Sequence, residues 1–395
     1  MAASSTAQDR GPAFEPEEYA RRLRACREEL GRLFLDGLLV SSPENIYYLS
    51  GYGTKGVFAY QVLIVPAQGD IVLVTRGIEA GNAAAVMPHS PIKRFVTYTD
   101  QESPTALVAQ EIRRLDLARA RIGCEKRNWF LVVQAFEQLQ AELEGAVFTD
   151  ATAVVEGLRA VKSPAEMNYL RSAAAISETA ADAALAVIHE GATENDVAIA
   201  VISSLISGGG EYVATWPNIK AGWRTGLAHA AWAGEPLRRG EWLTMEFAGV
   251  VRRYHAPVYR TVFLGQPAPP YRRIAETLRR AHDAGVQALR PGNTVGEVDR
   301  IQRSVIEGDG YAKLIGHRTG YAVGIGFPPT WAQTNGISFL PGSDIELQAG
   351  MVFHMVLYLV EPAIFGMGVG QTVAVTETGH EILTSRTDKG PIYLA

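Results

Sequence analysis

The sequence predicts an α+β protein of two domains, an N-terminal α/β domain and a C-terminal domain in which helices surround one antiparallel sheet. Three observations support this fold class. The chain has 395 residues of 47% hydrophobic composition, which is enough for two cores. Helix and strand patterns alternate in the first part of the chain. A capping-box pattern, Ser163-Pro164-Ala165-Glu166, then opens a long helix, and we expect the boundary between residues 158 and 159.

The N-terminal domain is expected to span residues 15–158, after a disordered lead-in over residues 1–14. Apolar residues recur at helical spacing from Tyr19 to Phe34, and a short apolar strand follows. We expect helices at residues 16–34, 44–48, 107–115 and 129–143, and strands at 37–40, 60–65, 70–75, 121–123 and 147–150. This alternation indicates a mixed sheet that helices cover.

The C-terminal domain is expected to span residues 159–395. Thr193 with Asp196, and Thr294 with Glu297, repeat the capping pattern that opens helices. We expect helices at residues 164–189, 193–207, 270–289 and 294–307, and strands at 316–327, 351–360 and 369–376. Between them, residues 240–265 alternate as two strands, with turns possible at Ala248-Gly249 and Arg252-Arg253.

Composition and charge exclude several classes of function. The net charge is -5 and no basic cluster exceeds Arg-Arg, which argues against a nucleic-acid partner. No apolar run reaches the ~18 residues of a membrane helix, and the first residues lack a secretion-signal pattern. The two cysteines, Cys26 and Cys124, lie far apart in sequence, and we expect both to be reduced thiols. We expect a cytoplasmic protein that binds no membrane.

Glu246 is the most informative residue of the hairpin at 240–265. A carboxylate in an otherwise apolar strand is costly unless it is paired or used in chemistry. One interpretation is a salt bridge to a nearby arginine. The other is a catalytic carboxylate whose pKa the apolar strand raises. His229, His255 and Tyr259 lie close in sequence and favour the second interpretation.

The hairpin resembles the first metal-ligand hairpin of the pita-bread superfamily, family M24, which includes methionine aminopeptidase, prolidase and creatinase. Arg260-Thr261 stand where that family has Arg-Thr. The segment from Asn45 to Tyr52 resembles the N-terminal domain of creatinase and prolidase, so the resemblance covers nearly the whole chain. It implies a creatinase-like α/β domain followed by a pita-bread catalytic domain, and a homodimer.

The metal ligands of that family are not retained. Aligned by motif, the five ligand positions carry Glu246, Pro257, Tyr321, Val356 and Gly370. A dinuclear site needs several hard oxygen donors and a histidine. The resemblance therefore implies a metal-free member of the superfamily that needs no cofactor.

Residues 316–331 resemble ectoine hydrolase-type members more than prolidase or creatinase. The pattern is Arg-Thr-Gly-Tyr-x-x-Gly-x-x-x-Pro-Pro-x-Trp. The alternative is a glycine-rich strand with close backbone packing. Two departures indicate a shifted substrate preference. Where the ectoine hydrolase-type members carry acidic residues, this chain has Thr330-Trp331-Ala332-Gln333. In the same way, Gln371 stands where those members are expected to have a carboxylate.

The resemblance assigns roles to individual residues. His229 matches the segment that holds the catalytic histidine in creatinase, although a lone histidine there is often a surface residue. His255 can equally serve as a structural hydrogen-bond partner, and His354 can face either side of its strand. The expected catalytic residues are Glu246, His229, His255 and His317. The expected substrate-binding residues are Tyr321, Tyr259, His354 and Trp331, with Tyr52 and Phe58 supplied by the partner chain.

These residues are consistent with cleavage of a non-peptide C–N bond in a small polar amino-acid derivative, such as a cyclic amidine or amide. Glu246 would act as general base or as nucleophile, and His229 would pass a proton to the departing nitrogen. Two alternatives stay open. The same groups can run a dehydrating cyclisation or an elimination, and a pita-bread domain without metal can serve as a binding module.

Overall fold

The structure is a computed structural model in which residues 12–333, 335–385 and 392–394 are described. It divides into two compact units, Met1–Arg159 and Ala160–Ala395. Most of the expected lead-in lies outside the described residues. Phe14, at its end, is buried against the ring of Tyr19 and the guanidinium of Arg22, so ordered packing begins before residue 15. In the described residues, no helix combines the length and hydropathy that a membrane crossing needs.

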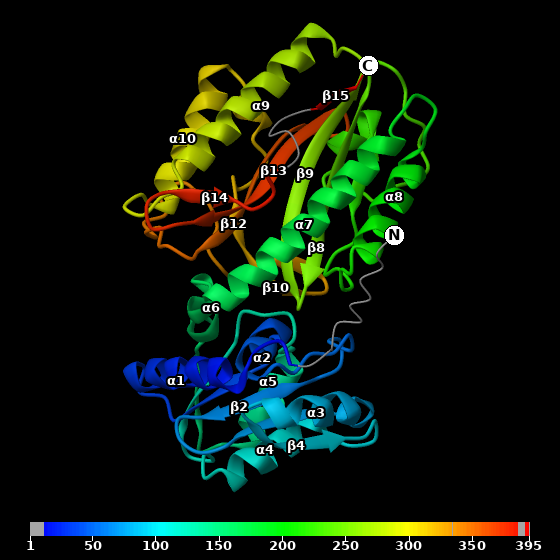
Figure 1. The fold of residues 1–395 in the computed structure, drawn as a ribbon. Helices are drawn as coiled ribbons and strands as arrows, with labels where there is room; N and C mark the ends of the chain where they lie inside the picture. The colour runs from blue at the N-terminus through cyan, green and yellow to red at the C-terminus, as the bar shows by residue number, and fades with distance from the viewer. Residues whose placement is uncertain (1–11, 334, 386–391, 395) are drawn as a thin grey trace. The chain divides into compact units, whose positions relative to one another are not determined.

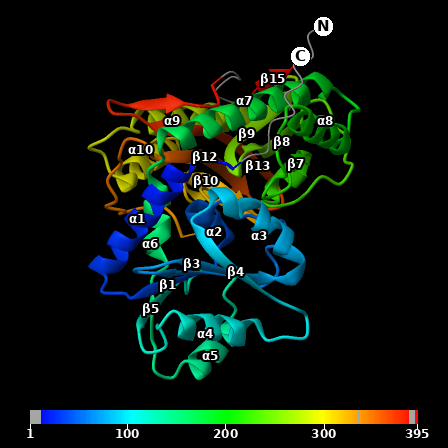
Figure 2. The same ribbon diagram turned by 60° about the horizontal axis from the view of Figure 1, so that its bottom comes forward.

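The N-terminal unit contains the mixed sheet that the sequence predicts. The strand order is β4-β3-β2-β1-β5-β6, with β1–β2 and β2–β3 antiparallel and the other neighbours parallel. Helices α4 and α5 pack together against this sheet (Figure 2). The strands are β1 (Gly37–Val40), β2 (Val62–Pro66), β3 (Ile71–Arg76), β4 (Ile92–Tyr98), β5 (Arg121–Cys124) and β6 (Val147–Asp150). The helices are α1 (Pro16–Arg32), α2 (Pro43–Ser50), α3 (Ala80–Val86), α4 (Pro104–Arg114), α5 (Val133–Glu142) and α6 (Ala153–Ala160).

The C-terminal unit is built on a nine-stranded sheet. Its order is β11-β10-β12-β13-β9-β8-β7, with β14 on β13 and β15 on β9. These strands are antiparallel except for the β15–β9 pair. The strands are β7 (Asn218–Ala221), β8 (Trp242–Val251), β9 (Tyr254–Leu264), β10 (Tyr321–Phe327), β11 (Thr330–Ala332), β12 (Val352–Glu361), β13 (Phe365–Val375), β14 (His380–Ile382) and β15 (Ile392–Leu394).

Four helices cover one face of this sheet. They are α7 (Pro164–Val187), α8 (Glu194–Ser207), α9 (Pro269–Gln287) and α10 (Val295–Gly308). Figure 1 shows α7 lying along β8 and β9, and α9 beside β12 and β13. Alternate strand residues such as Met245, Phe247 and Leu357 fill the cores between sheet and helices. The intervening residues therefore point to the opposite face.

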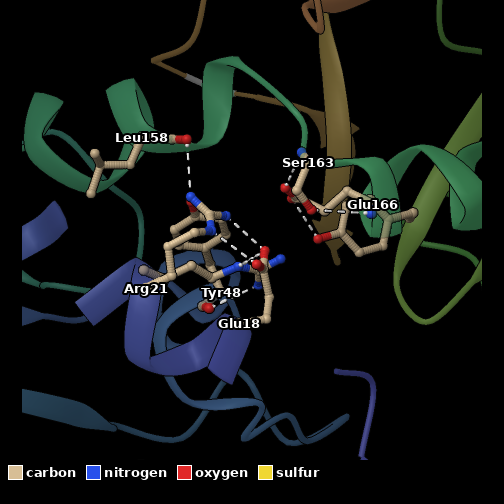
Figure 3. A network of polar contacts seen from close by, with 8 residues as sticks. Glu18, Arg21, Tyr48, Leu158, Ser163 and Glu166 are labelled. Atoms are coloured by element: carbon tan, nitrogen blue, oxygen red, sulfur yellow. Dashed lines mark hydrogen bonds and ion pairs between the residues drawn. The ribbon is translucent and has the colours of Figure 1, made fainter. Parts of the chain in front are cut away.

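The three capping boxes form as predicted. At α7, the Ser163 hydroxyl accepts from the Glu166 amide at 3.4 Å, and the Glu166 carboxylate accepts from the Ser163 amide at 2.8 Å (Figure 3). Thr193 with Asp196 and Thr294 with Glu297 do the same at α8 and α10. These helix starts are local in origin, which is why the sequence alone locates them.

The central hairpin turns at one of the two predicted places. β8 continues through Ala248 and Gly249, and the chain reverses at Arg252 and Arg253, which have φ values of 48° and 66°. Non-glycine residues rarely adopt this left-handed region. Arg253 is held there by distant partners, because its guanidinium donates to the Gly326 carbonyl at 2.6 Å and lies 3.9 Å from the Tyr212 ring centre.

Candidate active site

The face of the C-terminal sheet opposite the helices carries a polar cluster centred on Glu246. Strand register places these side chains next to one another, since Glu246 pairs with both Asn218 and Tyr259. Tyr259 pairs with Gly370 of β13, which pairs with Val356 of β12. On the same face His354 pairs with Tyr321 of β10. Six strands, β7, β8, β9, β10, β12 and β13, thus bring together residues that lie more than a hundred positions apart in sequence.

Glu246 and His354 lie next to each other in this cluster. Oε1 of Glu246 lies 3.4 Å from Nε2 of His354, a separation of ion-pair type. The other carboxylate oxygen accepts from the Asn218 amide at 3.1 Å. His354 is 0% exposed, and neither of its ring nitrogens has a hydrogen-bond partner among the described residues. A buried imidazole without such partners is costly, so this pair is a strong indicator of function.

The prediction that the apolar strand raises the pKa of Glu246 is wrong. Burial does act in that direction and is the largest single influence. It is outweighed by His354, Asn218 and Lys220, which together hold the pKa of the carboxyl below its usual value. Glu246 is therefore ionised in the neutral pH range, as a base or a nucleophile must be.

Carboxyl NMR can test this ionisation. We expect the Glu246 signal, identified by its loss in E246Q, to titrate below the ordinary value of 4.5. Because the folded-state pKa is lowered, ionised Glu246 stabilises the fold at neutral pH. That contribution is lost as the pH falls through the folded-state pKa. A midpoint above 4.5 would contradict the balance of charges described here.

His317 lies in the same electrostatic neighbourhood as Glu246. Its ring stacks on Tyr358 with a centroid distance of 6.0 Å and an angle of 13°. Although His317 as a residue is exposed, its ring is flanked by protein, and this desolvation lowers the pKa of the imidazole. The charge of Glu246 opposes this lowering, while the charge of His229 adds to it. His317 is therefore neutral and able to accept a proton near pH 7.

His229 is exposed in the turn that follows the 3-10 helix Gly222–Gly226. His229 is the smallest of the influences on the pKa of His317. That His229 works together with Glu246 remains a prediction.

Tyr321 and Trp331 are both buried, at 9% and 3% exposure. The indole Nε1–H of Trp331 donates to the Tyr321 hydroxyl at 3.0 Å, and the Tyr321 ring meets the His354 ring edge-on at 5.4 Å. Burial, then the charge of Glu246, raises the pKa of Tyr321. Tyr321 is therefore a neutral phenol, which can donate a hydrogen bond to developing negative charge.

Tyr259 is a second neutral phenol of the cluster. Burial raises its pKa well above the usual value, and Tyr358 and Glu246 act in the same direction. The Tyr358 ring lies 5.9 Å from that of Tyr259, and burial raises the pKa of Tyr358 to about 12. Like Tyr321, both tyrosines are neutral phenols, and the charge of Glu246 helps to raise the pKa of each.

The contacts of His255 are structural and do not favour the catalytic role that the sequence suggested for it. Its Nδ1–H donates to the Arg253 carbonyl at 2.8 Å, and its Nε2 accepts from the Ala214 amide at 3.1 Å. Burial, followed by the charge of Arg253, lowers the pKa of His255 well below its usual value. Both ring nitrogens are occupied by backbone groups, so His255 is a neutral structural residue.

Replacing His255 by alanine should therefore lower stability. The change leaves a cavity and an unpaired Ala214 amide, and we expect a loss of about 2–4 kcal/mol in unfolding free energy. Denaturant unfolding measures this loss. The control H189A removes an exposed imidazole and should stay within about 0.5 kcal/mol. Unchanged stability in H255A together with lost turnover would restore the catalytic assignment.

Tyr52 and Phe58 belong to the N-terminal unit. Tyr52 is 1% exposed, and its hydroxyl lies 3.0 Å from that of Thr75 on β3. This hydrogen bond makes Tyr52 part of its own domain's packing. Phe58 is 84% exposed, as a residue that contacts another chain would be. Their role in closing a partner's site stays a prediction.

Four residues of the cluster were not predicted from the sequence: Asn218, Lys220, Arg318 and Tyr358. The four-residue strand β7, which carries Asn218 and Lys220, follows Pro217 and is too short to give a pattern. The guanidinium of Arg318 lies 4.2 Å from the Tyr321 ring centre and donates to the Ser338 hydroxyl at 2.9 Å. The sequence did offer one signal for Lys220, because this lysine stands between the apolar residues Ile219 and Ala221, which are both buried.

The positions that correspond to metal ligands in the related hairpin do not fit a metal here. Among Glu246, Pro257, Tyr321, Val356 and Gly370, Glu246 alone carries a carboxylate. In the part of the chain that the structure describes, no three His, Cys, Asp or Glu side chains group as metal ligands. One carboxylate is too small a donor set for a divalent ion.

The space at position 370 is also filled. A Cβ added to Gly370 would lie 2.6 Å from Cε1 and 3.0 Å from Nε2 of His354, and 2.9 Å from Cβ of Tyr259. The His354 ring thus stands where a side chain of residue 370 would point. Glu246 faces an imidazole at the place where a second carboxylate would otherwise lie.

Comparisons with known proteins agree with the fold. Residues 168–377 match the model of metallopeptidase family M24, and residues 22–161 match the creatinase/prolidase N-terminal domain. Ectoine hydrolase from Halomonas elongata is 30% identical over 386 residues, which cover 94% of this chain and 96% of that protein. Dipeptidase PepE from Mycobacterium ulcerans superposes with a TM-score of 0.83 at 25% identity, over 96% of this chain and 99% of that chain. A recombinant prolidase from Thermococcus sibiricus gives a TM-score of 0.84 at 22% identity, over 95% and 99%, a likeness of fold.

Proposed function

The chain belongs to metallopeptidase family M24 and is a hydrolase of that family, and we propose that it cleaves a non-peptide C–N bond without a metal ion. The proposed substrate is a small polar amino-acid derivative, such as a cyclic amidine or amide of the ectoine type. The contact between Glu246 and His354 carries this proposal, because it supplies an ionised carboxylate where the donor set does not fit a metal.

Hydrolysis needs an attacking oxygen, and Glu246 is placed to provide or activate it. Its carboxylate is ionised, and 13% of its side chain is exposed, so a water or a substrate carbon can approach. In one route Glu246 removes a proton from water, and in the other it attacks the carbon directly. In the first route, His354 stabilises the Glu246 carboxylate before the carboxylate receives the proton from water. His354 also keeps the orientation of that carboxylate fixed.

The remaining groups have complementary tasks. His229, with His317 beside it, delivers a proton to the departing nitrogen, since an imidazole donates and accepts near neutral pH. The neutral phenols Tyr259 and Tyr321 donate hydrogen bonds to the oxygen of the tetrahedral carbon. Arg318 has no ion-pair partner among the described residues and is available for the carboxylate of an amino-acid derivative.

Incubation of the chelator-treated protein with two substrate sets tests the proposal. The first set contains ectoine and other cyclic amidines, amides and ureides, and the second contains Xaa-Pro and other dipeptides. Mass spectrometry detects the gain of one water. We expect turnover in the first set and none in the second.

Each other result has a definite meaning. Cleavage of dipeptides alone contradicts the non-peptide specificity and favours a peptidase like the related dipeptidases. The ring-opened products of the first set are supplied as substrates in a separate incubation, and loss of water from one of them assigns the site to a cyclase. Tight binding without turnover, equal in wild type and E246Q, assigns it to a binding module.

A further inference from the structure

Lys220 is a buried lysine that the steps above do not use. It is 1% exposed on the edge strand β7, and no described carboxylate lies within ion-pair distance of its amino group. Desolvation lowers the pKa of Lys220 to about 8, although the charges of Glu246 and Glu194 oppose this shift. Burying an ammonium group without an ion pair is costly, so its contacts deserve a functional explanation.

The amino group of Lys220 binds one short turn. It donates to the carbonyls of Leu227, at 3.0 Å, and Ala228, and it lies 5.6 Å from the centre of the Tyr358 ring. Two of its three N–H groups are therefore used on the two residues that immediately precede His229. Lys220 ties this turn to the sheet.

The ends of the same loop are fastened by another residue. The Glu194 carboxylate, which is fully buried, accepts from the amides of Ala221 at 2.8 Å and Ala233 at 2.6 Å, and from Arg224 Nε at 3.1 Å. Within the turn, the Leu227 amide donates to the Arg224 carbonyl at 2.9 Å. Glu194 thus fixes where the loop begins and ends, and Lys220 fixes its middle.

Lys220 also connects this turn to Glu246. It lies two residues along β7 from Asn218, whose side chain binds Glu246, so both side chains lie on the polar face of the sheet. Its positive charge is one of the influences that lower the pKa of Glu246. One strand of four residues therefore contacts both the carboxylate and the turn of the exposed histidine.

We propose that Lys220 is a positioning residue, whose ammonium group holds the turn that carries His229 beside the face that carries Glu246. The catalytic meaning of this arrangement rests on the proposed function. The tethering of the turn does not rest on it and can be measured without a substrate.

Amide hydrogen exchange of residues 226–231 tests the tethering. In K220M we expect exchange in this segment at least about tenfold faster than in the wild type, because the turn opens locally. Exchange in α9 and α10 should stay unchanged. K162M is the matched control, since Lys162 is also buried in this unit and its amino group donates to the Ala160 carbonyl at 3.0 Å. Unchanged exchange at 226–231 in a folded K220M overturns the proposal.

Kinetics test the link to catalysis once a substrate is known. We expect K220M to lower kcat with KM nearly unchanged and to shift the acid limb of the pH profile upward, because Glu246 loses a neighbouring positive charge. K220R, which keeps charge and donors, should recover part of kcat. Faster exchange with an unchanged kcat would overturn the catalytic link. Faster exchange in a protein that turns over no substrate would leave the tether standing and reject the proposed function instead.

If K220M does not fold, the tether can be tested in the wild-type protein. In 15N-lysine spectra, the ammonium signal of Lys220 should exchange slowly with water, as a buried and hydrogen-bonded group does. A rapidly exchanging ammonium group would contradict the tether.

Discussion

Replacing Glu246 by glutamine is expected to lower turnover by about a thousandfold or more, with binding of the substrate retained. The amide has nearly the same shape as the carboxylate and can still contact Asn218. It can neither accept a proton at neutral pH nor attack carbon as a carboxylate does. The measurement is kcat and KM under the conditions that give wild-type turnover, with far-UV circular dichroism as the check on folding.

E381Q is the matched control for this substitution. Glu381 is a half-exposed carboxylate on β14 of the same unit, paired with Arg171 at 2.7 Å. Losing a surface ion pair costs about 1 kcal/mol or less, so turnover should stay close to wild type. Full activity in E246Q would remove Glu246 from the mechanism.

Replacing Gly370 by glutamate is expected to destabilise the C-terminal unit by about 3 kcal/mol or more, and not to create a metal site. The new Cβ would lie 2.6 Å from the His354 ring and 2.9 Å from Tyr259 Cβ, so these side chains or their strands must shift. The added carboxylate would also be buried beside Glu246, where two like charges repel. Denaturant unfolding and the metal content of the purified variant are the two measurements.

Two further variants make this prediction specific. G308A places a methyl group at a helix position with nothing within 4 Å and should change stability by less than about 0.5 kcal/mol. H354A combined with G370E removes the ring that blocks the new side chain and should recover part of the lost stability. A stable G370E protein that binds metal with His354 intact would show that the imidazole does not block the position.

The elements that the sequence predicted well are those with local causes. The capping boxes at Ser163, Thr193 and Thr294 fix helix starts through bonds that span three residues. The strands of the hairpin at 240–265 follow from their two-residue alternation. The pita-bread resemblance, carried by short motifs, is confirmed by the family match over residues 168–377.

The errors have non-local causes. The strand expected at 316–327 begins only at Tyr321. β7 was missed because its four residues pair with β8 across a long loop. His255 lies close to Glu246 in sequence, but Ala214 and Arg253 occupy its ring nitrogens.

The pKa of Glu246 shows the same limit. Sequence reveals the apolar strand around this residue, and burial alone does raise the pKa of a carboxyl. His354 lies more than a hundred residues from Glu246 in the sequence. Lys220 and Asn218 lie on β7, a strand that the sequence pattern did not predict. Only the fold reveals that these groups face the carboxylate and reverse the sign of the shift.

Metal content measured together with turnover is the most direct test of the central claim, that a carboxylate and imidazole pair works here without a metal. The active protein would be assayed before chelation, after chelation and after addition of manganese, cobalt or zinc, with elemental analysis of each sample. We predict a turnover rate per protein molecule that is independent of metal content and is lost in E246Q. Turnover that falls with chelation and returns with an added divalent ion would contradict the account.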